Sequence, residues 1–224
     1  MKRLFTIFTI LVTSAVIAQN PIEKNIGDFK ELKVYDLIEV ELIKSDANKI
    51  VITGENAQSV LVNNKNGILK IKMELSKIFD GDNTKVKLYY STIDVIDANE
   101  GSTVHSKDVI KQFEMDLKAQ EGANIEIAVD VNYVNAKAVT GGIIKVTGTT
   151  KKQNVALLTG GIFQGGELKS ENSDVSINAA GEAYVNASKI VDIKIRAGGD
   201  VFVYGKPETI NESKAFGGRV KRMD

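Results

Sequence analysis

The chain has 224 residues and no cysteine, and its 29 lysines and arginines balance its 29 aspartates and glutamates. Without cysteine, a disulfide framework and thiolate metal sites are excluded. The balanced charge offers no basic patch to a phosphate backbone, so we do not expect a nucleic acid as a partner. With a single histidine, any metal site would need oxygen ligands, and we expect no metal and no other cofactor.

Residues 1–18 have the composition of a secretory signal peptide. The basic start Lys2-Arg3 precedes an apolar run over residues 4–17, and small residues ending at Ala18 precede polar ones. This run is shorter than the roughly 20 residues that span a bilayer, so we expect cleavage after Ala18 and no membrane anchor. The mature chain is therefore predicted to be exported to the periplasm, the cell surface or the medium, without stable membrane insertion.

Residues 19–93 form an N-terminal β-rich part in which apolar and polar side chains alternate over short segments. Segments such as 38–42, 69–73 and 86–90 are separated by turns of Gly, Asn and Asp. This pattern predicts a meander of strands about five residues long, each exposed on one face. The sequence Asp80-Gly81-Asp82-Asn83 lacks the closing glutamate of a calcium loop, so we interpret it as a hairpin turn.

From residue 94 to residue 224 the sequence repeats a unit of about 19 residues centred on a small residue. The anchors of the seven units are Gly101, Gly122, Gly141, Gly160, Ala180, Gly198 and Gly217. Apolar residues recur five and three positions before each anchor and three after it, except at Glu212 and Lys214 in the last unit. Side chains two apart share one face of a strand, so these columns predict a core shared by stacked coils about 4.8 Å apart.

The fold class predicted from these features is all-β, with a β-solenoid of about 19-residue coils following the N-terminal meander. The anchors are expected at bends that need a positive φ. The charged last unit would protect the open edge of the stack, and the meander would cover the other end.

Several segments resemble a known family, namely the "head GIN" domain of putative auto-transporter adhesins in exported Bacteroidetes proteins. The resemblance covers about residues 25–220 and is carried by the segments 29–34, 38–42, 67–71, 93–96 with Gly101-Ser102, and Tyr204-Gly205-Lys206-Pro207. One departure is Ser91-Thr92, where the family often has a proline. The resemblance implies a right-handed parallel β-helix and an adhesin-like module of the cell envelope, and it transfers no catalytic residues.

Two outward columns of the repeat supply the candidate ligand-binding residues. Tyr184 and Phe202 lie four positions after their anchors, and their rings would offer an aromatic surface to a sugar or to a partner's apolar side chain. Glu182 and Asp200 lie two positions after the same anchors, at a spacing that suits glycoside hydrolysis. Because Arg219 follows in that column, a solvated charge ladder is the favoured interpretation. His105, for which the neighbouring sequence specifies no orienting acid, is predicted to be an ordinary surface residue.

The sequence therefore favours a structural or binding module without catalysis, whose partner is a glycan or an envelope or surface protein. Two alternatives stay open. The first alternative is a periplasmic sensing or scaffolding domain that binds proteins. The second is a polysaccharide-acting β-helix enzyme that uses Glu182 and Asp200. A monomer and a homo-oligomer are both compatible with the sequence.

Overall fold

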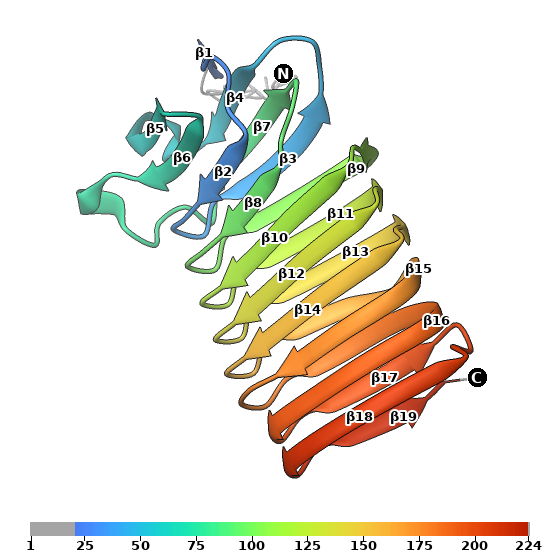
Figure 1. The fold of residues 1–224 in the computed structure, drawn as a ribbon. Helices are drawn as coiled ribbons and strands as arrows, with labels where there is room; N and C mark the ends of the chain where they lie inside the picture. The colour runs from blue at the N-terminus through green and yellow to red at the C-terminus, as the bar shows by residue number, and fades with distance from the viewer. Residues whose placement is uncertain (1–20, 224) are drawn as a thin grey trace, which may run out of the picture.

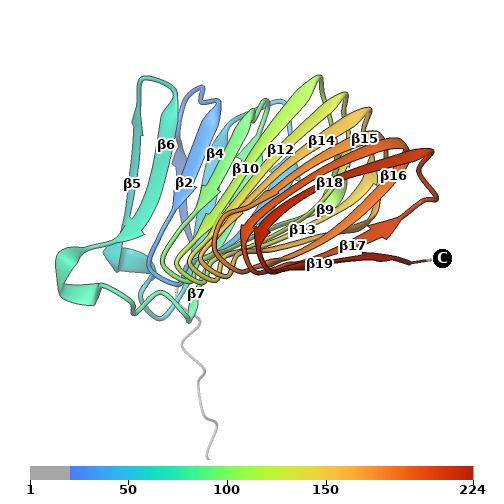
Figure 2. The ribbon, with the colours of Figure 1, turned by 60° about the horizontal axis from the view of Figure 1, so that its bottom comes forward.

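The computed structural model describes residues 21–223, which wind into a stack of flattened coils (Figure 1). Each coil contributes a strand, or half of a long strand, to each of two opposite faces of the stack, which we call the first and the second sheet (Figure 2). Two long strands that run through both faces join them into one hydrogen-bonded network. The first sheet contains, in spatial order, β5 (Val60–Lys65), β6 (Ile68–Met73), β2 (Glu31–Val34), β8 (Val95–Ala98), β10 (Glu114–Gln120), β12 (Tyr133–Val139), β14 (Lys152–Leu158), the second halves of β15 (Ile162–Ile177) and β16 (Glu182–Ala197), and β18 (Thr209–Phe216).

The second sheet is built in the same way from the other strand of each coil. Its strands are β1 (Ile22–Asn25), β4 (Lys49–Gly54), β7 (Thr84–Tyr90), β3 (Glu39–Lys44), β9 (Thr103–Lys111), β11 (Asn124–Asp130), β13 (Ile143–Thr149), the first halves of β15 and β16, β17 (Asp200–Tyr204) and β19 (Arg219–Arg222). Two short 3-10 helices, η1 (Ala57–Ser59) and η2 (Leu75–Lys77), lie in the N-terminal part.

The inward columns predicted from the repeat form the core between the two sheets. Residues at equivalent positions of successive coils pair in register, and those three positions before the anchors are at most 1% exposed as far as Ile195. In the last coil, Glu212 and Lys214 are exposed and form an ion pair of 2.9 Å. The prediction of a β-solenoid is therefore confirmed, with charged residues at its C-terminal edge.

The bends that follow the first sheet place two consecutive residues at positive φ. In the early coils these are the anchor and the residue before it, such as Thr140 and Gly141. In the last three coils they are the anchor and the residue after it, such as Gly198 and Gly199. A positive φ at the anchor is thus common to all seven coils, including the one whose anchor is Ala180, where φ is 50°.

Replacing Ala180 by glycine is expected to stabilise the protein. A left-handed conformation costs an L-residue about 1–2 kcal/mol, and glycine recovers this while losing about 0.5–1 kcal/mol in the entropy of the unfolded chain. The net gain of about 0.5 kcal/mol would raise Tm by about 1–2 °C, measured by thermal unfolding followed by circular dichroism. A lower Tm for Ala180→Gly would contradict a strained backbone at this bend.

The N-terminal part joins the stack in an order that differs from its order in the chain. Strand β2 lies between β6 and β8, and β3 lies between β7 and β9, with parallel pairing throughout. The antiparallel strands β5, β4 and β1 follow at this end of the stack, beyond β6 and β7. The predicted boundary between residues 93 and 94 is therefore bridged by two pairs of strands.

The predicted signal peptide over residues 1–18 lies outside the described residues, and its cleavage stays a prediction. Within residues 21–223, no helix has the length and apolar character that crossing a membrane would require.

Candidate binding groove

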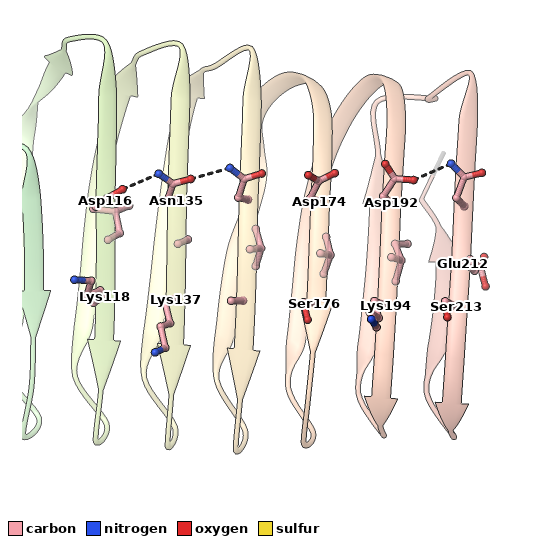
Figure 3. Close-up of a pocket in the computed structure, with 18 residues that line it drawn as sticks. Asp116, Lys118, Asn135, Lys137, Asp174, Ser176, Asp192, Lys194, Glu212 and Ser213 are labelled. Atoms are coloured by element: carbon pink, nitrogen blue, oxygen red, sulfur yellow. Dashed lines mark hydrogen bonds between the residues drawn. The ribbon is translucent and has the colours of Figure 1, made fainter.

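An open groove of about 750 Å³ runs over the outer surface of the first sheet. It crosses the strands from β10 to β18, and the strands themselves form its floor (Figure 3). Its long axis is therefore parallel to the axis of the stack, and successive coils contribute equivalent positions to its walls. Five steps between coils give the groove a length of about 24 Å.

One wall is a ladder of aspartate and asparagine side chains, all six positions before an anchor. We call this set the Asp/Asn ladder; it consists of Asp116, Asn135, Asn154, Asp174, Asp192 and Asn211. Each member pairs in register with the next along the sheet. The labelled members Asp116, Asn135, Asp174 and Asp192 lie in one row across the strands (Figure 3).

Hydrogen bonds join the ladder at its two ends. The Nδ2 of Asn154 donates to Oδ1 of Asn135, and the Nδ2 of Asn135 donates to Oδ1 of Asp116, each at 2.7 Å. At the other end, Nδ2 of Asn211 donates to Oδ1 of Asp192 at 2.7 Å. These amide donors are directed along the row, and Nδ2 of Asn135 also donates to Oε1 of Glu114, outside the ladder, at 2.7 Å.

The centre of the ladder has acceptors that no ladder amide satisfies. Among the described residues, no hydrogen bond joins Asn154 to Asp174 or Asp174 to Asp192. Lys152 forms an ion pair of 2.6 Å with Asp174, and this hydrogen bond raises the pKa of the lysine above its ordinary value. A carboxylate has about four lone-pair sites, so Asp174 keeps free capacity to accept hydrogen bonds.

The opposite wall consists of side chains four positions before the anchors, about 7 Å from the ladder along each strand. Its members are Lys118, Lys137, Ala156, Ser176, Lys194 and Ser213. The small side chains of Ala156 and Ser176 leave the wall low at the centre of the groove, between lysines on either side. The wall has three lysines and the ladder three aspartates, so the two rows balance in charge, although only Lys118 and Lys194 share a coil with an aspartate.

The four residues predicted as ligand-binding candidates lie on the second sheet and not in this groove. The structure brings them together, since Tyr184 pairs with Phe202 and Glu182 with Asp200 on adjacent coils. The Tyr184 hydroxyl donates to Glu182 at 3.0 Å. Arg219 donates two hydrogen bonds to Asp200 and holds the pKa of that carboxyl below its ordinary value.

The rings of Tyr184 and Phe202 are stacked on each other, with centroids 4.6 Å apart and planes inclined by 9°. On the far side of Phe202, Lys221 Nζ lies 5.5 Å from the ring centroid. Both faces of Phe202 are therefore in use, and of this pair only Tyr184 keeps a ring face without an aromatic or cationic neighbour. Ligand binding by these residues stays a prediction.

His105 has an acidic neighbour that the sequence does not reveal. Its Nε2 lies 3.3 Å from Oε1 of Glu39, which is 66 positions earlier in the chain and belongs to the adjacent coil. The pair is partly exposed at the surface. Within the described residues, no cluster of three or more histidine, cysteine, aspartate or glutamate side chains is arranged to hold a metal ion.

The Asp/Asn ladder is absent from the sequence-predicted candidates, although its six members share one phase of the repeat. The signal that identifies it is a column occupied only by aspartate or asparagine over six successive coils. The inward columns align the coils with one another, and the same alignment places the outward residues six positions before each anchor in one row. The hydrogen bonds of the ladder and the low centre of the opposite wall could be identified only from the structure.

Comparisons with known proteins give one family match and several structures of the same fold. The family described as "Putative auto-transporter adhesin, head GIN domain" matches residues 28–207. A crystal structure called a putative adhesin, from Bacteroides fragilis NCTC 9343, is similar with a TM-score of 0.84 and 18% identity, over 91% of this chain and 96% of that chain.

Two further structures come from Parabacteroides distasonis ATCC 8503. One, called a putative adhesin, has a TM-score of 0.75 and 18% identity over 91% of this chain and 96% of that chain. The other, called a putative lipid binding protein, has a TM-score of 0.70 and 17% identity over 92% and 96%. At these identities the similarity shows a shared fold. No curated protein matches the chain.

Proposed function

The chain belongs to the family described as "Putative auto-transporter adhesin, head GIN domain", and we propose that it is an exported binding module that holds an extended, neutral glycan along the groove of the first sheet. The observation that carries this proposal is the Asp/Asn ladder, which repeats hydrogen-bonding groups at the spacing of the coils over six strands.

The spacing of the ladder favours a polymer of sugar rings. Equivalent side chains recur about every 4.8 Å along the groove, which is close to the length of one pyranose ring. An extended polypeptide advances by only about 3.3 Å per residue, so it would match the coils only at about every third residue. A linear glycan therefore meets the same group on each successive coil.

The hydrogen-bonding groups at the centre also favour a hydroxylated ligand. Asp174 and Asp192 each accept from one neighbour, Lys152 and Asn211 respectively, and keep further lone pairs to which sugar hydroxyl groups can donate. Donors to the sugar oxygens come from the lysines of the opposite wall, while the low wall at Ala156 and Ser176 leaves room for the chain. Because the two walls balance in charge, a neutral glycan fits better than a strongly anionic polymer.

Blocking the low wall tests this proposal. In Ala156→Lys, a long side chain would fill the centre of the groove, and we expect binding of linear glycans to weaken at least about tenfold, which corresponds to about 1.4 kcal/mol. Affinities would be measured by isothermal titration calorimetry after a glycan array has selected the ligand. The matched control is Ala128→Lys, at a half-buried outward position of the second sheet, which should bind like the wild type.

Other results would identify a different role. Equal loss in both lysine variants, or no binding to any linear glycan, would contradict the groove proposal. Recovery of specific envelope proteins in a pull-down, unaffected by Ala156→Lys, would support a sensing or scaffolding domain. Binding to lipid vesicles without glycan binding would support a role like the one named for the Parabacteroides distasonis neighbour.

The geometry of the second sheet gives less support to glycoside hydrolysis. A hydrolase of this kind uses a carboxylic acid whose pKa is raised so that it can donate a proton. The hydrogen bonds from Arg219 lower the pKa of Asp200, which leaves this residue only the role of the ionised carboxylate, and Arg219 already donates to both of its oxygens.

A further inference from the structure

A second hollow, of about 350 Å³, opens on the outer surface of the second sheet. Its lining comes from four successive coils and consists of Lys145, Thr147, Gln164, Gly166, Glu167, Tyr184 and Tyr204. It lies on the opposite side of the stack from the Asp/Asn ladder and shares no residue with the groove.

The hollow coincides with an irregularity in β15. Gln164 pairs with Lys145, but the next pair is Leu168 with Gly148, so residues 165–167 of β15 face only residues 146–147 of β13. Gly166 lies in this bulge and has no side chain to fill it. A Cβ atom at Gly166 would lie 3.4 Å from the ring of Tyr204, which therefore leans across the adjacent coil over the glycine.

Tyr184 forms the wall of the hollow with the ring face that the aromatic stack leaves free. Phe202 covers one face from the coil on the C-terminal side. The hollow lies on the other side, because Gln164 precedes Tyr184 by one coil and Lys145 by two. Tyr204 adds a second aromatic ring at the edge, so two tyrosines enclose one end of the hollow.

Most of the remaining side chains of the lining also carry hydrogen-bonding groups beside their apolar atoms. Gln164 and Thr147 each offer both kinds of hydrogen-bonding group, and Glu167 offers acceptors. Lys145 is held by Glu126 at 2.7 Å, and this hydrogen bond raises the pKa of the lysine above its ordinary value. The lysine is thus charged and positioned at the far end from the two tyrosines.

From this arrangement we infer that the hollow is a binding site for a single pyranose ring, such as the terminal sugar of a glycan. One face of such a ring carries C–H groups that pack on an aromatic face, while its edge carries hydroxyl groups. The C–H groups would pack on the free face of Tyr184. The hydroxyl groups would form hydrogen bonds with Gln164, Thr147 and Glu167. The inference does not depend on the groove, because the two sites lie on different sheets.

The site is tested with free monosaccharides by saturation-transfer difference NMR and by titration of chemical shifts. We expect at least one hexose or N-acetylhexosamine to bind with Kd in the millimolar range. Tyr184→Ala should raise that Kd about tenfold or more, because the stacking face is lost. Tyr184→Phe keeps the face and loses only the hydroxyl bonded to Glu182, so its Kd should stay within about threefold of the wild type.

Gln164→Ala removes a hydrogen-bonding group without touching the aromatic stack, and it should also weaken binding. This variant tests the site independently if Tyr184→Ala fails to fold. Ala156→Lys in the groove should leave monosaccharide binding unchanged, so failure at one site is distinguishable from failure at the other. The inference is overturned if no monosaccharide binds, or if binding survives in both Tyr184→Ala and Gln164→Ala. Preferential binding of N-acetyltyrosinamide would overturn it in favour of a protein side chain as the occupant.

Discussion

Ile177→Asp is expected to unfold the protein at room temperature or to leave it with only marginal stability. Ile177 is fully buried in the first sheet, where it stacks between Leu157 and Ile195 of the neighbouring coils. An aspartate there would be a buried charge without a partner, which costs about 3–5 kcal/mol in addition to the lost apolar contacts. Domains of this kind are stable by only about 5–15 kcal/mol in total.

The effect would be measured as the midpoint of urea denaturation, with secondary structure followed by circular dichroism. The matched control is Ser176→Asp, at the adjacent outward position of the same strand, where the new carboxylate remains in water next to Lys194. Its midpoint should stay close to that of the wild type. A stable Ile177→Asp variant would show that this column does not face the core.

Gly142→Ala should cause the second large loss of stability. A Cβ atom at this position would lie 2.1 Å from the carbonyl oxygen of Ala119 on the preceding coil, far closer than any real contact. Because the obstacle is backbone, relief requires the coils to move apart, and overpacking of this kind costs about 3 kcal/mol. The change would be measured as the free energy of unfolding in urea.

The neighbouring glycine provides the control, because it is required for another reason. Gly141 has a φ of 73°, and no atom lies within 4 Å of the position a Cβ would take. Gly141→Ala should therefore cost only the conformational penalty of about 1–2 kcal/mol. Equal losses in the two variants would mean that close approach of the coils does not determine the need for glycine at residue 142.

The sequence predicted the solenoid because the repeat places inward residues in fixed columns. Leu117, Ala136 and Val155 occupy one such column, and parallel pairing in register puts them on successive coils as expected. The N-terminal order was not predictable in this way. The pairing of β2 with β8 joins residues more than 60 positions apart, and residues 19–93 show no repeat that would reveal it.

The candidate sites were predictable in part. The column positions of Tyr184 and Phe202 implied that they are neighbours, and they are. The inclination of the rings depends on side-chain rotamers, which a column of the repeat does not specify. Only the structure therefore shows that Tyr184 and Lys221 cover the two faces of Phe202. The hollow beside Tyr184 depends on the bulge in β15, which leaves no periodic trace in the sequence.

The position of β2 and β3 inside the stack affects the order in which the protein folds. These are among the first strands of the chain, yet both partners of β2 come later, at residues 68–71 and 95–98. Closing such long loops is slow compared with pairing coils that are about 19 residues apart. We therefore expect the C-terminal coils to form a nucleus first and the N-terminal strands to insert last, so the first-made part of the chain stays open until the rest of the stack has formed.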